Sequence, residues 1–596
     1  MKKWIAIISV LALCFCSLFA AQNNISVPIT SDVYRVIDNA VIRGIIPSQA
    51  EVKPYSYSKV KGLLDEIKSS GSISTAEGDY IESLLASLDR SYGGNQVLNV
   101  TDALYNGYLT GFGNDTFDVV AGGRFSNQNT IGVNNGAKDF RNKVTAYIAG
   151  DISQNLSFYI DFSVLVDKLD HNAFLANDFD TDCEGWYMGF GKEGEKTMVS
   201  PFKSFEEGLA MSPEIGATIF DGAISFRFGS VKREWGPGIN NLALSGTARS
   251  FDAIEFTFSP SKKFSFSVAL GSLGKGFLEM EGQALPVGSV SLRDCEYENN
   301  ISIQRIEVSP IEGLKLAIFE SVVYRKRFEL AYLNPLSIYM FAQNYIGDFD
   351  NVLAGVDFSY TLKNVGKVYL ALSVDEFAKV TPQLFFSWPR NIVAIQGGVN
   401  VPVSVGLFGE LTLQATYIPP FYGSHYTLVS GKQPFYDGNV KIDYVNKGKP
   451  LSSPLYPDTV EIMASFDTTI NPNLTVGVTI KDQMRSAQYA IDETYGTTLH
   501  DHIKYSDSAR YVEKDFFSYI WNNILDIEID GKWSFDSFPL TLKTGVQCIL
   551  ESSREFSVSE SAKAQNYNTG DQTTITSSWS KPDARYIVKV GFDVYY

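Results

Sequence analysis

Residues 264–271 read FSFSVALG and residues 224–229 read ISFRFG, so that apolar side chains alternate with small or polar ones. A β-strand points successive side chains to opposite faces, and this period of two therefore gives each stretch one apolar and one polar face. The same alternation recurs in residues 156–164, 314–318, 368–374, 407–413, 474–480 and 540–550. The sequence thus predicts many amphipathic strands.

The connections between these strands differ strongly in length. Short turns fall at residues 153–155, 221–222, 259–262, 311–313, 363–366, 402–405 and 471–473. Long loops fall at residues 168–212, 231–250, 272–299, 325–352, 375–391, 418–458, 482–520 and 551–584. A soluble β-sandwich also alternates apolar and polar residues, but short periplasmic turns opposite long outer loops are typical of an outer-membrane barrel. We therefore predict a transmembrane β-barrel of about 18 antiparallel strands over residues 101–596, in the bacterial outer membrane.

The chain ends in an amphipathic strand. From Tyr586 to Tyr596 every second residue is apolar or aromatic, and the last residue is a tyrosine. This ending resembles the signal that barrel-insertion machinery reads. Outer-membrane lipid and that machinery are therefore expected partners.

The first residues predict export. Lys2 and Lys3 precede an apolar run over residues 4–19, which ends in small residues at Ala20 and Ala21. This is the layout of a secretory signal peptide, here residues 1–21. No later stretch approaches the ~20 apolar residues that a membrane-spanning helix needs.

Residues 22–100 have a different pattern from the rest of the chain. Apolar residues recur at helical spacing over residues 33–41, 58–67 and 81–88, and Ser74 with Glu77 forms a capping box before the third segment. We expect a small helical bundle. It is too small to be stable without docking on something larger, so it is a candidate plug for the periplasmic mouth.

Charge and composition exclude several classes of function. Without the two lysines of the signal, 48 basic residues stand against 67 acidic ones, a net charge of −19 that disfavours a nucleic-acid partner. Cys183, Cys295 and Cys548 are too widely spaced for a metal cluster or a disulfide framework. Residues 178–182 lack the glycine and glutamate of a calcium loop, and residues 500–502 read as a solvated loop. We predict no cofactor, no metal and no enzymatic activity.

The most distinctive motif lies in the long loop after residue 230. Residues 233–238 read REWGPG, and residues 242–245 read LALS. Here the chain resembles the capsule-assembly Wzi family of outer-membrane proteins, whose members carry an R-x-W-G-P-G segment followed by an L-x-L-S-like stretch. The resemblance extends from the helix at residues 31–46 over nearly the whole mature chain. The candidate glycan-binding or family-motif residues are Arg233, Trp235, Gly236, Pro237, Gly238, Asn334, Pro335, Asp350, Asn351 and Asp375.

The resemblance implies a barrel with a helical bundle at its periplasmic mouth. Such a protein helps to attach or assemble surface polysaccharide, either capsule or exopolysaccharide, and is not an enzyme. The alternative is a porin-like channel for small polar solutes, since a polar lumen would be lined by inward residues. These are Arg227, Glu255, Glu410, Gln414, Lys589 and Asp593. An outer-membrane hydrolase is the third hypothesis.

Two roles are open for the REWGPG motif. A rigid Gly-Pro-Gly turn would hold the Trp235 ring against the apolar face of a sugar, with Arg233 paired to an acidic sugar. The interpretation that we favour is a constriction loop folded into the lumen, with Arg233 paired to an inward carboxylate such as Glu255. The pairs Asn334-Pro335 and Asp350-Asn351 read first as turn and cap chemistry.

Overall fold

A computed structural model describes most of the chain. The described ranges are residues 24–88, 110–114, 117–153, 155–168, 186–188, 206–220, 222–273, 299–325, 329–334, 336–346, 350–376, 391–419, 422–423, 442–446, 449–455, 459–486, 520–535, 538–557 and 576–595. The predicted signal peptide, residues 178–182 and 500–502, Cys183 and Cys295 lie outside these ranges.

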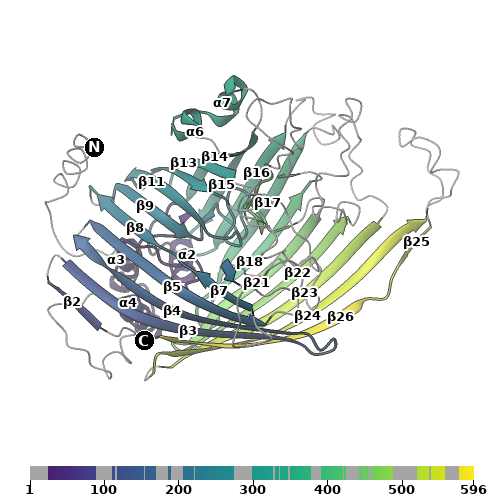
Figure 1. The fold of residues 1–596 in the computed structure, drawn as a ribbon, viewed down its shortest axis with the longest axis horizontal. Coiled ribbons are helices and arrows are strands. Elements are labelled where there is room, and N and C mark those ends of the chain that lie inside the picture. The colour runs from purple at the N-terminus through teal and green to yellow at the C-terminus, as the bar shows by residue number, and fades with distance from the viewer. Residues whose placement is uncertain are drawn as a thin grey trace.

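Within the described ranges, eighteen antiparallel strands form the wall of a closed barrel, with β7 and β8 counted as one interrupted strand (Figure 1). The wall strands are β3 (Phe117–Gly132), β4 (Lys138–Ser153), β5 (Leu156–Lys168), β7 (Glu206–Ala210) with β8 (Glu214–Ile219), β9 (Ile224–Val231), β11 (Phe251–Ser261), β12 (Phe264–Ser272), β13 (Asn299–Val308), β14 (Leu314–Arg325), β15 (Asn351–Leu362), β16 (Gly366–Glu376), β17 (Ile392–Val403), β18 (Leu407–Ile418), β21 (Thr459–Asn471), β22 (Leu474–Ser486), β23 (Ile520–Ser534), β24 (Leu540–Ser557) and β26 (Asp583–Tyr595).

The barrel closes where its last strand meets its first. β26 pairs with β3, with Tyr595 opposite Arg124 and Ile587 opposite Gly132. The short strand β2 (Thr110–Asn114) lies on the same edge of β3, nearer to its start. Two further short strands, β6 (Trp186–Met188) and β25 (Thr576–Trp579), pair with β7 and β24. The predicted strand number and the predicted fold class are confirmed.

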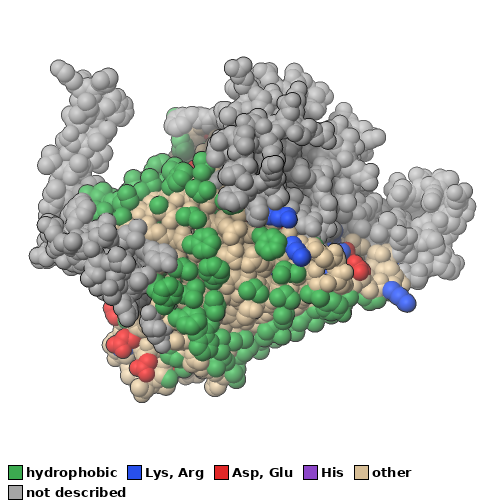
Figure 2. Space-filling model, turned by 60° about the horizontal axis from the view of Figure 1, so that its bottom comes forward, with side chains coloured by type: hydrophobic (Ala, Val, Ile, Leu, Met, Phe, Trp, Pro, Cys, Tyr) green, Lys and Arg blue, Asp and Glu red, His purple; other side chains and the backbone are tan. Residues whose placement is uncertain are grey.

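The outer face of the wall is apolar. On β14, Ile318 is 63% exposed, whereas its neighbours Ala317 and Phe319 point inward and are buried. Figure 2 shows hydrophobic side chains gathered over one side of the barrel. An outward apolar band is what a transmembrane barrel presents to lipid. In the described part of the chain, no helix has the length and apolar character to span a membrane.

Between residues 24 and 88, the structure describes three helices. They are α2 (Val33–Ile42), α3 (Tyr57–Ser69) and α4 (Thr75–Leu88). Ser74 and Glu77 form the predicted capping box: the Ser74 backbone N–H donates to Glu77 Oε2 at 2.8 Å, and the Glu77 N–H donates to Ser74 Oγ at 3.2 Å. Gly44 ends the first helix in the left-handed region, with φ of +67°, as its position after the apolar stripe predicts.

The helices dock on the short turns of the barrel. Arg35 donates to the carbonyl oxygens of Leu407 and Phe408 at 3.1 and 2.6 Å, and Asn39 donates to that of Gly409 at 2.8 Å. The backbone nitrogen of Asn364, in another short turn, donates to the carbonyl of Ile42. Because short turns mark the periplasmic end of such barrels, the bundle lies at that end.

A small helical hairpin lies on the outer face of the wall. It contains α6 (Leu330–Leu333) and α7 (Tyr339–Ile346), which stand beside the end of β14 (Figure 1). Glu320 points outward from β14 and accepts hydrogen bonds from the backbone nitrogens of Tyr339 and Met340 at 2.8 and 2.7 Å. The hairpin thereby covers a carboxylate that would otherwise lie on the lipid-facing side.

Candidate functional site

The loop that carries the REWGPG motif folds into the lumen. Its strand β10 (Glu234–Trp235) pairs with β1 (Val52–Lys53), from the segment between the first two helices. The Gly236 N–H also donates to the carbonyl of Glu51 at 2.9 Å. A loop from the outer end and a segment from the periplasmic bundle therefore share one small sheet inside the barrel.

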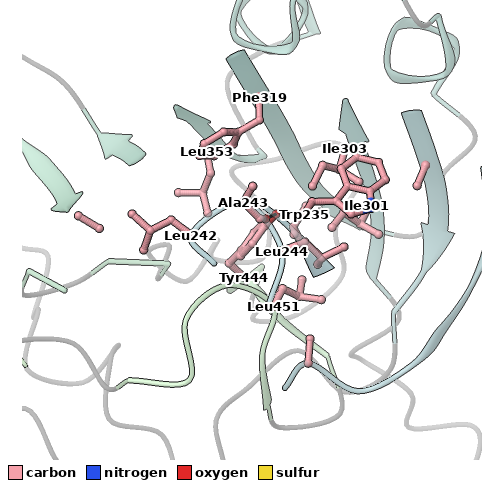
Figure 3. Close-up of a cluster of buried hydrophobic side chains, with 14 of the residues drawn as sticks. Trp235, Leu242, Ala243, Leu244, Ile301, Ile303, Phe319, Leu353, Tyr444 and Leu451 are labelled. Atoms are coloured by element: carbon pink, nitrogen blue, oxygen red, sulfur yellow. Dashed lines mark hydrogen bonds between the residues drawn. The ribbon is translucent and has the colours of Figure 1, made fainter. Parts of the chain in front are cut away.

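Trp235 is the centre of an apolar cluster within the lumen. Its side chain is 0% exposed and packs with Leu242, Leu244 and wall residues that include Ile301 (Figure 3). The Trp235 backbone N–H donates to the carbonyl of Leu244 at 3.0 Å. No face of the ring is free in this arrangement, so the geometry corresponds to the constriction loop rather than to a sugar-stacking platform.

Arg233 anchors the start of the same loop. Its Nε donates to Glu255 Oε2 at 2.8 Å, and its Nη atoms donate to the carbonyl oxygens of Val231, Phe251 and Gly229 at 3.0 to 3.3 Å. The side chain is completely buried. Arg233 therefore pairs with Glu255, the carboxylate that the constriction-loop interpretation names.

The Gly-Pro-Gly turn carries the loop to the opposite wall. Gly236 has φ of +137°, where a side chain would be strained. A Cβ on Gly238 would lie 2.7 Å from Gln414 Oε1 and from the Tyr369 ring, so glycine permits the close approach. Beyond Pro237, the Ile239 N–H donates to Gln414 Oε1 at 3.0 Å. The motif thus spans the lumen from β9 to β18.

A buried charge network holds the N-terminal segment beside this loop. Glu51 lies 3.1 Å from Lys367 Nζ, 3.6 Å from Lys315 Nζ and 3.7 Å from Arg305 Nη2. Burial by itself raises the pKa of the Glu51 carboxyl, but these three cations together hold the pKa well below its usual range.

The same network extends along the wall. Arg305 donates to Glu307 Oε1 at 2.7 Å and to both carboxylate oxygens of Asp357. No sequence motif singles out these residues or Glu51. Each wall residue occupies an inward position of an alternating strand, and that signal would have found them. Nothing in the local sequence pairs Glu51 with them.

Two candidate residues hold a third segment in the lumen. Asn351 Nδ2 donates to the carbonyl oxygens of Ile442 and Gly423 at 3.1 and 3.4 Å. Asp375 Oδ2 accepts a hydrogen bond from the Gly423 N–H at 2.8 Å. These side chains attach the outer loop after β18 to the inner wall, where β19 (Val445–Asn446) and β20 (Lys449–Pro450) form a short hairpin.

Asp350 and Asn334 lie on the other side of the wall. Asp350 Oδ2 accepts from the hydroxyl of Tyr332 at 2.7 Å, in the external hairpin. Asn334 Oδ1 accepts from the Leu336 N–H at 3.1 Å, which is turn chemistry of the predicted kind. Pro335 lies outside the described residues. The candidate residues are therefore split between the lumen and the outer face, and they do not converge on one site.

The described residues offer no metal site, because no group of three histidine, cysteine, aspartate or glutamate side chains is placed to hold an ion. Cys548 is a free thiol. The polar groups of the lumen are paired mainly with one another or with loop backbone, an arrangement that fixes inserted segments.

A solved structure resembles this barrel over almost its whole length. The structure of Wzi from Escherichia coli, described as an outer-membrane protein involved in group 1 capsule assembly and a carbohydrate-binding β-barrel, matches with a TM-score of 0.51. This chain shares the fold of Wzi. The two sequences are 11% identical, and the match covers 97% of this chain and 100% of Wzi.

Two porin structures match with lower TM-scores. OccK8 (OprE) and OprD of Pseudomonas aeruginosa have TM-scores of 0.40 and 0.37 and identities of 8% and 9%. Each match covers 80% of this chain, with 98% of OccK8 and 95% of OprD. No protein-family model matches the chain, and no curated protein does. The likeness to Wzi supports the fold.

Proposed function

We propose that this protein is a non-enzymatic outer-membrane protein that binds surface polysaccharide and assists its attachment or assembly. The pairing of Val52 with Trp235 is the observation that carries the proposal. It joins the periplasmic bundle to an outer loop within the lumen, which suits a fixed binding scaffold better than an open pore. The shared fold of Wzi, which is described as a carbohydrate-binding β-barrel, supports the same function.

In this proposal the REWGPG motif contributes to glycan binding indirectly, because it supports the surfaces that the glycan contacts. Arg233 and Trp235 hold the loop in place, and Gly236, Pro237 and Gly238 carry it across the lumen. Asn351 and Asp375 hold the neighbouring outer loop, while Asn334 and Asp350 belong to the external hairpin or its attachment. The glycan then meets surfaces that these residues position.

The direct test is binding of surface polysaccharide purified from the source cells to the folded protein in detergent. Folding is checked by heat-modifiable mobility on gels. We expect saturable binding by the folded protein and none by the heat-unfolded chain. Absence of binding by folded protein would overturn the proposal.

A channel for small polar solutes is the second candidate. It is favoured by charged side chains on the inner wall that keep contact with solvent: Lys543 and Lys589 are 52% and 30% exposed. Large, stable conductance steps of the intact protein in a planar bilayer would support the channel. Their absence, together with polysaccharide binding, would support the first proposal.

A further inference from the structure

A cavity of about 670 Å³ lies at the periplasmic end of the lumen. One side is formed by the start of α3, including Ser58 and Lys59, and the other by inward residues of β9, β11, β12, β13 and β14. Its size falls in the range of ~300–1,000 Å³ that small ligands occupy in proteins. The exposed turn that contains Lys262 lies at its edge, so the cavity is reached from that end.

Five lysines line this cavity: Lys59 and Lys61 on α3, Lys262 and Lys263 in the turn between β11 and β12, and Lys315 on β14. Among the described residues, no carboxylate forms an ion pair with Lys59, Lys262 or Lys263. The whole chain has a net charge of −17. A concentration of unpaired ammonium groups at one cavity is therefore a local feature and does not follow from the overall charge.

The other cations of the cavity are already compensated. Lys315 lies 3.6 Å from Glu51, and Arg227 Nη1 donates to Glu255 at 2.7 Å. The wall charges thus neutralise one another, whereas Lys59 on the helix and Lys262 and Lys263 on the turn remain available for an anion that enters the cavity.

The wall between these lysines is lined by hydroxyl groups. Ser225, Thr257, Ser259, Ser265 and Ser309 face the cavity from the barrel strands, with Ser56 and Ser58 opposite on the helix side. The Oγ atoms of Ser259 and Ser265 lie 2.8 Å apart. Hydroxyl groups both donate and accept hydrogen bonds, and they match the hydroxyl groups of a sugar.

Lys59 is the most enclosed of the three lysines without a carboxylate partner, because Lys262 and Lys263 are exposed. Its Nζ lies 3.8 Å from the centre of the Tyr55 ring. Burial lowers the pKa of the Lys59 ammonium to about 8; the Glu307 carboxylate opposes this shift and the Lys315 cation adds to it. A half-buried cation without a carboxylate partner is stabilised when an anionic ligand arrives.

We propose that this cavity binds an acidic saccharide, one that carries carboxylate or phosphate groups, with Lys59, Lys262 and Lys263 contacting the anionic groups and the serine-rich wall contacting the sugar hydroxyls. The inference rests on the proposed function and deepens it, because it names the class of ligand and the end of the barrel at which the ligand binds. Ammonium groups supply charge without fixed geometry, so both kinds of anionic group fit the same lysines.

The test uses the full-length folded protein in detergent and three probes: trigalacturonate, glucose 6-phosphate and the neutral trisaccharide maltotriose. The variants are Lys59→Gln and the double variant Lys262→Gln/Lys263→Gln, whose lysines lie in an exposed turn. Lys68→Gln is the matched control, because Lys68 is also on α3 but pairs with Glu82 at 2.7 Å and does not line the cavity. Affinities are measured by calorimetry at two salt concentrations.

We expect trigalacturonate or glucose 6-phosphate to bind the wild type at least tenfold more tightly than maltotriose binds. The acidic probe that binds shows whether carboxylate or phosphate is preferred. Lys59→Gln and the double variant should each lose about tenfold, and Lys68→Gln should bind like the wild type. Equal affinity of wild type and Lys59→Gln, equal binding of maltotriose, or no binding of either acidic probe would overturn the inference. Binding of the acidic probes without binding of the cells' own polysaccharide would instead contradict the proposed function alone.

Discussion

Val52 and Trp235 lie opposite each other in a two-stranded antiparallel ladder inside the barrel, although 182 residues separate them along the chain. One comes from the segment between the first two helices and the other from an outer loop. Their pairing joins the helical bundle to the constriction loop inside the barrel.

Removal of residues 22–95 should open the barrel. The deletion removes α2, α3, α4 and β1, so the constriction loop loses the partner of Trp235. Conductance in planar bilayers should rise, while heat-modifiable mobility on gels should persist because the wall strands remain. Unchanged conductance of a folded deletion variant would place the obstruction elsewhere.

Trp235→Ala should destabilise the protein by about 3–5 kcal/mol, because a large, fully buried ring is removed from a packed cluster. Polysaccharide binding per folded molecule should not change, since the ring has no exposed face. Trp235→Phe, which keeps an aromatic ring, should lose less stability. Loss of binding in a fully folded Trp235→Ala protein would restore the sugar-stacking role.

Glu51→Gln should destabilise the protein by about 3 kcal/mol, because Lys315, Lys367 and Arg305 lose a carboxylate that they share in a buried site. The pKa of the Glu51 carboxyl is lowered on folding, so its stabilisation is complete above the ordinary value of 4.5 and is lost as the pH falls through the lowered value. Denaturant titrations should therefore give a constant difference between wild type and Glu51→Gln from pH 8 to about pH 5, and a smaller one in stronger acid. A difference that already shrinks near neutrality would contradict this.

Binding of an acidic saccharide should weaken as the pH rises through about 8, where the Lys59 ammonium of the free protein loses its proton. The groups that face Lys59 are the Tyr55 ring, the Glu307 carboxylate and the Lys315 ammonium. Calorimetric affinities between pH 6.5 and 9.5 test the prediction with trigalacturonate. Lys59→Gln should remove this pH dependence, whereas Lys68→Gln should retain it.

Glu320→Ala should release the external hairpin. The variant removes the acceptor for the Tyr339 and Met340 N–H groups at the start of α7. Limited proteolysis within residues 329–346 should accelerate, without a change in heat-modifiable mobility. Glu312→Ala, in an exposed short turn, is the control and should be cleaved like the wild type.

The sequence by itself determined the barrel. Alternation in stretches such as residues 264–271 sets which face of each strand meets lipid, and a slip of one residue would place every apolar side chain on the wrong face. The order of short and long connections then set the topology and the strand number. Helical spacing and the Ser74–Glu77 capping box located the bundle for the same reason: these signals are local and repeat at fixed spacing.

Only the tertiary structure decided what fills the lumen. The REWGPG loop has no periodicity, and its residue types suit a sugar-binding surface and a packed constriction equally well. The path of the loop into the lumen depends on partners that are distant in sequence. Arg233 pairs with Glu255, Trp235 pairs with Val52, and the turn is held by Gln414. Asp350 and Asn351, adjacent in sequence, likewise serve opposite faces of the wall because neighbouring strand residues point in opposite directions and meet different loops there. Such contacts are fixed by the closure of the barrel, which brings together segments far apart in the chain.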